Sequence, residues 1–276
     1  MATKKERQRE LARQAYERRI ERQSQRARRT RQVWVSAIAA VLVLGVGFGS
    51  AALAGVWKTP AKKPAASTSP AASASPAPSV SPGSAMVNGK CVYTAAGTAA
   101  RKVSLPPVTP DTKATYTATM TTNRGNIVIK MLNSKAPCTV NSFVSLAGQK
   151  FFDNTPCHRL TTTQSGIYVL QCGDPSGSGS GGPGYVFYTE NLTGATYPAG
   201  TVAMANSGTA NSNGSQFFLV YKNTRLPANY TPFGTISSGL SILQAVADAG
   251  TDNSNGAGDG HPKETVQIDS MTISKT

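Results

Sequence analysis

Short runs in the second half of the chain alternate apolar and polar positions, which is the pattern of half-buried β-strands. Two of them, at residues 116–122 and 126–131, flank Asn123-Arg124-Gly125, whose Asn and Gly favour a hairpin turn. Further short apolar runs follow at residues 202–205, 216–221 and 233–236. Residues 266–273 predict a last strand, with a break in register between positions 268 and 271.

Two segments instead space their apolar residues three and four positions apart, which predicts helices. The first, residues 139–146, carries Val140, Phe143 and Val144, with Thr139 as the candidate N-cap and Gly148 as the candidate stop. The second is residues 240–247. Many short strands around two isolated helices predict a small, mainly β barrel.

A long apolar stretch precedes this region. Residues 33–57 contain no charged side chain, and Trp34 and Trp57 stand near the two ends, where indole rings favour the membrane interface. About 20 apolar residues in a helix suffice to cross a bilayer core of about 30 Å. The pattern favours an uncleaved transmembrane helix. A signal peptide cleaved after the small residues Ala52-Leu53-Ala54 is the alternative.

Composition divides the rest of the 276-residue chain. Residues 1–32 contain twelve Lys or Arg and four Glu, so this tail supplies +8 of the net charge of +15. Beside an apolar span, such a tail is typical of a cytoplasmic flank, and we disfavour nucleic-acid binding by it. Residues 58–85, mostly Pro, Ala and Ser, predict a disordered linker. Residues 86–113 are then an N-terminal flank of the folded domain, residues 114–276.

Cysteine usage suits a domain held outside the cell membrane. Cys91, Cys138, Cys157 and Cys172 permit one or two disulfides in an oxidising compartment, and their pairing stays open. No C-x-x-C spacing occurs and the chain has only two histidines, so we predict no metal site. Glycines 177, 179 and 182 match G-x-G-x-x-G, but no helix pattern follows, so we predict a flexible loop and no cofactor.

Four segments between Cys157 and Phe218 carry the most specific signal. They read Cys157-His158-Arg159-Leu160, Val169-Leu170-Gln171-Cys172-Gly173-Asp174-Pro175, Met204-Ala205-Asn206 and Asn213-Gly214-Ser215-Gln216-Phe217-Phe218. In order and content they resemble the cyclophilin family of peptidyl-prolyl cis/trans isomerases, whose motifs have the form F-H-R, Q-G-G-D-P, M-A-N and N-G-S-Q-F-F. The resemblance extends over roughly residues 114 to 274. It implies a closed barrel of eight antiparallel strands capped by two helices.

The reaction of that family needs neither a nucleophile nor a metal. A catalyst must hold the proline ring, fix the flanking carbonyl and stabilise a twisted amide whose nitrogen has become a hydrogen-bond acceptor. Arg159 is the candidate catalytic residue, because a guanidinium stays charged and presents several donors in a rigid fork. The resemblance implies ten substrate-binding residues: Tyr168, Val169, Gln171, Ala205, Asn206, Ser207, Gln216, Phe218, Leu226 and Tyr230.

The chain also departs from the family's pattern. Residues 161–166 make the spacing from Arg159 to Gln171 about four residues longer than is common in the family. Arg225 stands where many cyclophilins have an indole that binds cyclosporin, so we expect inhibition by cyclosporin to be about tenfold weaker, equivalent to about 1.4 kcal/mol. Tyr230 replaces a frequent His, and Ser207 a frequent Ala.

Two functions remain open from sequence. The first is a membrane-tethered, extracytoplasmic isomerase that assists the folding of exported proteins. The second is a binding module that holds proline-containing segments of a cell-envelope partner with little turnover. In both, the partners are proline-containing polypeptides and the membrane, through a single anchor. We predict no nucleic-acid partner and no oligomer.

Overall fold

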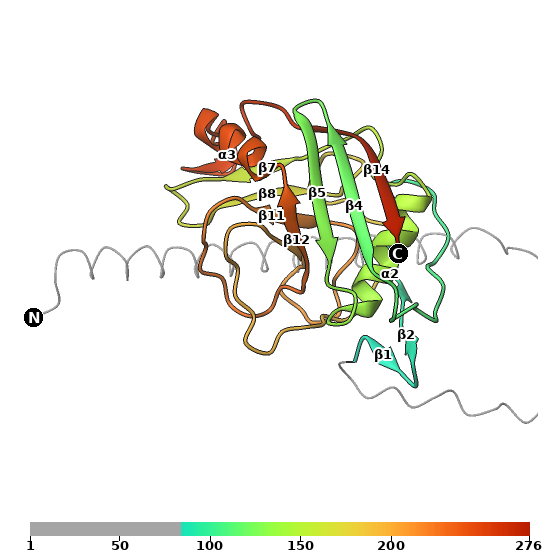
Figure 1. Ribbon diagram of the computed structural model, residues 1–276. Coiled ribbons are helices and arrows are strands. Elements are labelled where there is room, and N and C mark those ends of the chain that lie inside the picture. Colours follow the sequence, from blue (N-terminus) through green and yellow to red (C-terminus); the bar gives the residue numbers. More distant parts are fainter. Residues whose placement is uncertain (1–83) are drawn as a thin grey trace, which may run out of the picture. The chain divides into compact units, whose positions relative to one another are not determined.

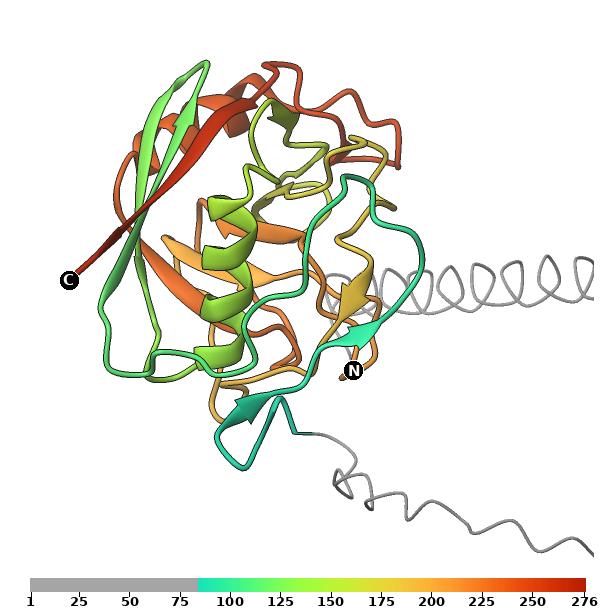
Figure 2. The same cartoon turned by 90° about the vertical axis from the view of Figure 1, so that its right-hand side faces the viewer.

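The computed structural model describes residues 84–276, which form a curled antiparallel sheet with two helices (Figures 1 and 2). The sheet has ten strands. In spatial order they are β13 (Asp259–Gly260), β7 (Arg159–Thr161), β8 (Val169–Cys172), β11 (Phe217–Val220), β10 (Thr201–Met204), β12 (Pro232–Ser238), β5 (Gly125–Met131), β4 (Tyr116–Thr122), β14 (Gln267–Lys275) and β6 (Thr155–Pro156).

The prediction of a closed eight-stranded barrel is wrong in both the number of strands and their closure. Hydrogen-bonded neighbours run from β13 at one edge to β6 at the other, and no ladder within residues 84–276 joins the two edges. Only Cys157 and His158 separate β6 from β7, yet β6 pairs with β14 whereas β7 pairs with β8. One bend thus divides a single stretch of chain into two strands, and β13, paired with β7, adds another.

The predicted hairpin is confirmed by β4 and β5. Buried residues alternate with more exposed ones along β4, beginning at Tyr116 and continuing at Ala118 and Met120. Gly125, with a φ of 116°, allows the tight turn between the strands. Along the other side of β4, β14 shifts register between Ile268 and Ser270, which confirms the predicted break.

The two predicted helices are confirmed as α2 (Pro137–Gly148) and α3 (Leu240–Ala249). Figure 2 shows α2 within the curve of the sheet, where the Phe143 ring lies 4.9 Å from that of Phe152 and 5.2 Å from that of Phe233. The main hydrophobic core lies between α2 and the concave side of the sheet, and these ring contacts are part of it. As predicted, α2 ends at Gly148.

The prediction of Thr139 as the N-cap of α2 is wrong. The cap position is Ala136, and Thr139 lies inside the first turn. The first N–H groups of a helix have no acceptor within it, and here a distant residue supplies one. The Glu190 carboxylate accepts hydrogen bonds from the backbone N–H of Cys138 at 3.2 Å and of Thr139 at 2.7 Å. Burial raises the pKa of Glu190 above its usual range.

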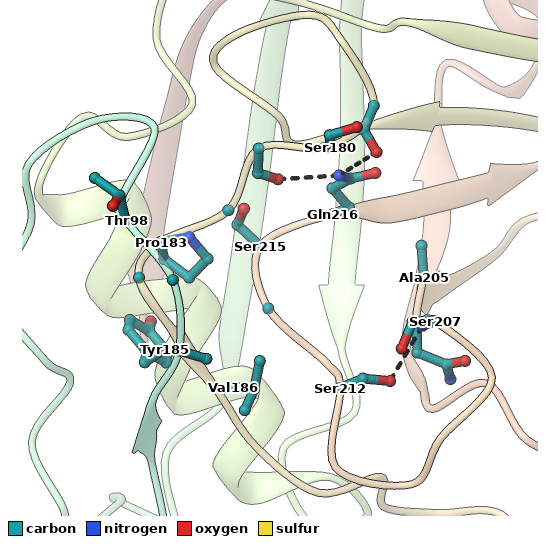
Figure 3. Close-up of a pocket in the computed structure, with 18 of the residues that line it drawn as sticks. Thr98, Ser180, Pro183, Tyr185, Val186, Ala205, Ser207, Ser212, Ser215 and Gln216 are labelled. Atoms are coloured by element: carbon teal, nitrogen blue, oxygen red, sulfur yellow. Dashed lines mark hydrogen bonds between the residues drawn. The ribbon is translucent and has the colours of Figure 1, made fainter. Parts of the chain in front are cut away.

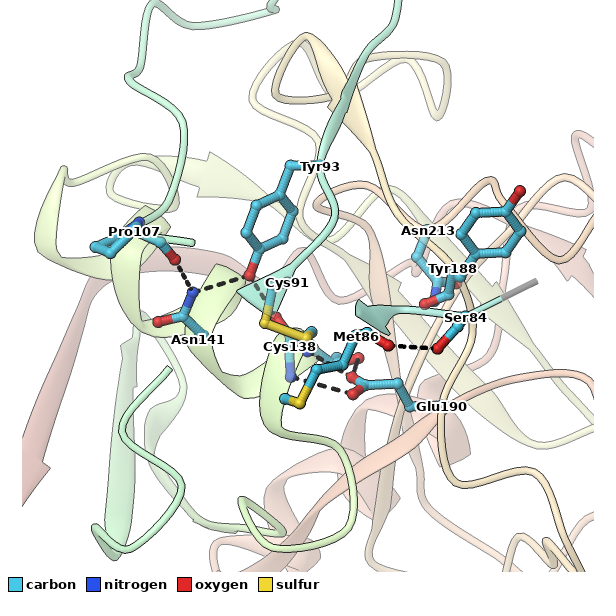
Figure 4. Close-up of a disulfide and its surroundings, with 11 residues drawn as sticks. Ser84, Met86, Cys91, Tyr93, Pro107, Cys138, Asn141, Tyr188, Glu190 and Asn213 are labelled. Atoms are coloured by element: carbon cyan, nitrogen blue, oxygen red, sulfur yellow. Dashed lines mark hydrogen bonds between the residues drawn. A yellow bond between two sulfur atoms is a disulfide. The ribbon is translucent and has the colours of Figure 1, made fainter. Parts of the chain in front are cut away.

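Residues 84–113 fold against the rest of the domain. β1 (Met86–Val87) and β2 (Lys90–Cys91) form a short hairpin, and β3 (Thr94–Ala95) pairs with β9 (Tyr185–Val186). A disulfide joins Cys91 to Cys138 at the start of α2 (Figure 4). Near it, the Tyr93 hydroxyl donates to the Cys138 carbonyl at 2.9 Å. The flank is therefore fastened to the helix that fills the core.

A second disulfide joins Cys157 to Cys172, so the structure gives the pairing that the sequence leaves open. The predicted tail (1–32), the predicted membrane span (33–57) and all but the end of the predicted linker (58–85) lie outside the described residues. Within residues 84–276, no helix combines the length and apolarity that crossing a membrane requires.

Candidate active site

Three neighbouring strands, β8, β11 and β10, bury side chains on both faces. Leu170 and Leu219 point into the main core, whereas their neighbours Val169 and Phe218 lie on the opposite face. We call the apolar group on that face the outer cluster. It consists of Val169, Tyr197, Ala203, Phe218 and Val220, with the partly buried Ala195, Ala205, Leu226 and Tyr230 packed against them.

Aromatic rings line the outer cluster. The rings of Phe218 and Tyr230 meet edge to face at 5.5 Å, and the ring of Tyr197 lies 6.3 Å from Phe218. The Tyr197 hydroxyl donates to the Tyr230 carbonyl at 2.8 Å and accepts from the Tyr230 backbone N–H at 3.1 Å, which fixes the segment that carries Tyr230. Such an apolar, partly open surface suits a small saturated ring.

Arg159 lies beside this cluster because of strand register. It stands opposite Gln171 in the β7–β8 pair, and Gln171 stands opposite Phe218 in the β8–β11 pair. The three side chains therefore form one row across neighbouring strands. The guanidinium donates from Nη1 to Gln171 Oε1 at 3.2 Å and forms a two-bond ion pair with Asp259.

Hydrogen bonds continue from Gln171 to the glycine-rich loop. Gln171 Nε2 donates to Gln216 Oε1 at 2.8 Å, and Gln216 Nε2 donates to the carbonyls of Gly179 and Gly181, both at 3.0 Å. Figure 3 shows Gln216 bonded to this glycine-rich loop. Gln216 lines a cavity of about 520 Å³. The predicted residues Gln171, Gln216, Ala205, Asn206 and Ser207 all line that cavity.

The far wall of the cavity comes from the flank. Ala96, Gly97 and Thr98 follow β3 and line the cavity. Backbone bonds hold this segment in place, from Ala96 N–H to the Gly184 carbonyl at 2.9 Å and from Ala100 N–H to the Gly182 carbonyl at 2.8 Å. The flank thus forms part of the site through these residues, and the disulfide of Cys91 just upstream attaches it to α2.

Asn206 also lines the cavity and fixes a turn there. Its Nδ2 donates to the Asn229 carbonyl at 2.8 Å, and its Oδ1 accepts from the Gly208 N–H at 3.0 Å. The Ser207 N–H donates to Ser212 Oγ at 3.1 Å (Figure 3). These bonds place Ala205 against the outer cluster and join the turn to the segment that carries Tyr230.

Ala205 belongs both to the lining of the cavity and to the outer cluster, so the two adjoin, and we call them together the groove. Nine of the ten predicted substrate-binding residues belong to one or the other, whereas Tyr168 belongs to neither. Its ring packs on Tyr221 at 5.9 Å, next to the main core, and the Lys222 ammonium lies 4.9 Å from its centre. Sequence reasoning missed Tyr197 and Asp259. No local sequence pattern marks either residue. Asp259, for example, is 100 residues from Arg159 in the chain.

Metal binding has no support in this part of the chain. Within residues 84–276, no three His, Cys, Asp or Glu side chains gather in a way that could hold a metal ion. The groove instead offers apolar contact, amide groups and one guanidinium. Groups of these kinds can bind and orient a neutral molecule through shape and hydrogen bonds.

His158, which directly precedes Arg159, is 7% exposed. Burial, which outweighs the attraction of Asp174, lowers the pKa of His158 below its usual value. Because the unfolded residue titrates near pH 6.5, His158 stabilises the fold above that pH, and this contribution is lost as the pH falls toward the folded pKa. We therefore expect the free energy of unfolding to decrease below about pH 6.5 and the variant His158→Phe to weaken that decrease.

Urea unfolding of both proteins between pH 7.5 and 4.5 measures this effect. His261→Gln serves as the control, because the His261 side chain is 62% exposed. It should retain the dependence on pH. An acid-side decrease that persists unaltered in His158→Phe would contradict the assignment to His158.

Comparison with known proteins agrees with the geometry. The family model for "Cyclophilin type peptidyl-prolyl cis-trans isomerase/CLD" matches residues 117–273. A curated relative from Mycobacterium leprae, a probable peptidyl-prolyl cis-trans isomerase B, is 47% identical over 199 residues, which is 66% of each chain. Its counterpart from Mycobacterium tuberculosis is 45% identical over 69% of this chain and 66% of the relative. The chain thus spans slightly less than two thirds of these relatives.

Solved structures share the fold. A crystal structure of a cyclophilin type peptidyl-prolyl cis-trans isomerase from Cryptosporidium parvum is 27% identical and has a TM-score of 0.51, covering 59% of this chain and 99% of its own. A second structure of that protein, in the presence of the dipeptide Ala-Pro, has a TM-score of 0.50. Residues 84–113 extend beyond the family match, which begins at residue 117.

Proposed function

Because this chain belongs to the cyclophilin family of peptidyl-prolyl cis/trans isomerases, an enzyme class, we propose that it isomerises X-Pro bonds in the groove beside Arg159. The observation that carries the proposal is the row of Arg159, Gln171 and Phe218 across three neighbouring strands. It puts a fixed cationic donor, an amide and an apolar ring surface side by side. These are the three elements that rotation about a prolyl amide needs.

Rotation about an X-Pro bond has a barrier of about 18–20 kcal/mol, because the amide bond has partial double-bond character. In the twisted amide, the nitrogen lone pair no longer conjugates with the carbonyl and can accept a hydrogen bond. Arg159 can donate that bond, since its guanidinium is held in place by Asp259 and Gln171 before substrate arrives. A donor oriented in advance stabilises the transition state more than the planar ground state.

The outer cluster supplies the binding side of the reaction. The proline ring packs against Phe218, Leu226 and Val169, which remain in one place while the amide rotates. Gln171 and Gln216 lie between this cluster and the cavity, where their amide groups can bind the substrate backbone. We infer that the residues preceding proline extend along the cavity toward the flank.

The isomerisation of a prolyl peptide tests the proposal. Exchange NMR on an Ala-Pro peptide, with the purified full-length chain at a small fraction of the peptide concentration, should show cis/trans interconversion far faster than the uncatalysed tens of seconds. Titration in the same tubes reports binding. Binding without faster exchange would favour the alternative, a recognition module, which the longer connection between Arg159 and Gln171 and the exposed Arg225 leave open.

We further propose that the domain lies outside the cell membrane, tethered by residues 33–57, and acts on exported proteins. Support comes from the uncharged span of residues 33–57, the basic residues that precede it and two disulfides, which are typical of oxidising compartments. The groove selects for proline and not for one sequence, which suits many clients.

Protease accessibility tests this location. In cells stripped of any outer layer, added protease should degrade the C-terminal domain while residues 1–32 stay protected. A tag at each end allows both to be followed on one blot, and lysed cells provide the control. Protection of the C-terminal tag in intact cells would contradict the orientation.

A further inference from the structure

Asp259 binds Arg159 through both carboxylate oxygens. Oδ1 accepts from Arg159 Nε at 2.8 Å, and Oδ2 accepts from Arg159 Nη2 at 2.7 Å. Two parallel charge-assisted bonds fix the plane of a guanidinium as well as its position, which a single bond does not. In that plane, Nη1 reaches Gln171 Oε1 at 3.2 Å.

We propose that Asp259 is a positioning residue for catalysis, which holds the Arg159 guanidinium in the orientation that donates to the twisted amide. This inference rests on the isomerase function proposed above. The pair is partly shielded from water, since the Arg159 side chain is 33% exposed and that of Asp259 is 21% exposed. Without the carboxylate, the long Arg side chain would sample several rotamers, and the donor would often lie away from the amide nitrogen.

Asp259 is itself held by the loop around it. Strand β13 pairs with β7, with Asp259 opposite Thr161. The Asp259 N–H donates to the Gly256 carbonyl at 2.9 Å, and Asn255 Nδ2 donates to Asp259 Oδ1 at 3.2 Å. The Asp259 carboxylate therefore comes from a strand next to that of Arg159, and hydrogen bonds to its backbone and side chain hold it in place.

The residues inserted after Arg159 support the same loop. The Thr162 N–H donates to the Gly258 carbonyl at 2.8 Å. Gly258 has a φ of 72°, and a Cβ at this position would lie 2.8 Å from both Gln164 Cβ and the Ser165 backbone nitrogen. The insertion thus packs on the loop that carries Asp259. The longer connection after Arg159 therefore helps to hold the loop that places the Asp259 carboxylate beside the guanidinium.

Two substitutions of Asp259 in the full-length chain test the proposal. Asp259→Ala should lower kcat/KM for an X-Pro peptide about tenfold, because a donor displaced by an ångström or so loses much of its effect. Asp259→Asn should lose less, since its Oδ1 can still accept one of the two bonds. Peptide affinity should stay within about twofold of wild type, because the outer cluster is unchanged. Asp269→Asn, at an exposed carboxylate of β14, is the matched control and should have no effect.

A second comparison shows whether Asp259 acts through Arg159. In an Arg159→Ala background, adding Asp259→Ala should lower the rate no further, because the group that it positions is already absent. If the two losses multiply, Asp259 acts on substrate or on the fold independently, and the proposal is overturned. Thermal melts show whether each variant is folded. If Asp259→Ala is not folded, the same comparison is made with Asp259→Asn.

The mobility of the Arg159 side chain gives a readout that does not depend on turnover. The heteronuclear NOE of Arg159 Nε–Hε should be high in the wild type and fall in Asp259→Ala, but not in Asp269→Asn. An unchanged NOE would overturn the proposal even if activity fell. If the wild-type chain shows no isomerase activity, the proposed function fails, and the NOE still decides whether Asp259 restrains the guanidinium.

Discussion

Replacement of Arg159 by Ala is expected to lower kcat/KM for prolyl isomerisation by about 100-fold or more. Removing one preorganised donor to a developing charge or lone pair typically costs about 3 kcal/mol of transition-state stabilisation. The planar substrate gains little from this donor, because its amide nitrogen is not yet an acceptor. Peptide affinity should therefore stay within about twofold, since the proline ring still packs on Phe218 and the outer cluster.

Exchange NMR and peptide titration on the same samples measure both quantities. Arg124→Ala is the matched control, because Arg124 lies in the β4–β5 turn and pairs with Glu264. It should retain full activity. Arg159→Lys keeps the charge but lacks the planar fork, and should recover only part of the loss. A fall in affinity as large as the fall in turnover would show that Arg159 serves ground-state binding alone.

Removal of the disulfide between Cys91 and Cys138 is expected to have the largest effect on stability. The bridge spans 47 residues and attaches the flank to α2. Restricting a loop of this length in the unfolded chain stabilises a protein by about 4 kcal/mol in the chain-entropy account. In a domain of this size, that loss would lower Tm by about 10 °C. The flank contacts of Tyr93 and Arg101 should then open more readily as well.

Denaturation of Cys91→Ala/Cys138→Ala beside wild type measures the difference. Cys157→Ala/Cys172→Ala is the comparison, because its bridge spans only 15 residues and should contribute about 3 kcal/mol. Hydrogen exchange at residues 84–113 separates a loss of flank docking from global unfolding. Equal stability of the first variant and wild type would contradict the proposed contribution of the bridge.

Local patterns were sufficient for much of the fold. The alternation of buried residues in β4 and β5 was visible in the sequence, because successive side chains of a strand point to opposite faces. The spacing of Val140 and Phe143 likewise revealed the buried face of α2. In both cases, neighbours in the chain carry the signal.

Where distant segments meet, the sequence was a poorer guide. Thr139 is a sound N-cap by residue type, but the first turn of α2 is satisfied by Glu190, which lies 51 residues further along the chain. Strand β13 has two residues in a loop rich in Asn and Gly, so no periodicity marks it. At Cys157 and His158 the chain changes its pairing partner, because β6 pairs with β14 whereas β7 pairs with β8. This change depends on distant strands, so the sequence did not indicate that the sheet has two edges here.

The sequence by itself indicated Arg159, Gln171, Gln216 and Phe218 through its resemblance to the cyclophilin motifs, and the structure brings these four residues together. Tertiary structure alone decided that Asp259 binds the guanidinium, that Tyr168 packs away from the groove and how the four cysteines pair. The physical reason is the same in each case. Periodicity and turn chemistry are properties of adjacent residues, whereas these contacts arise only when strand register brings distant parts of the chain together.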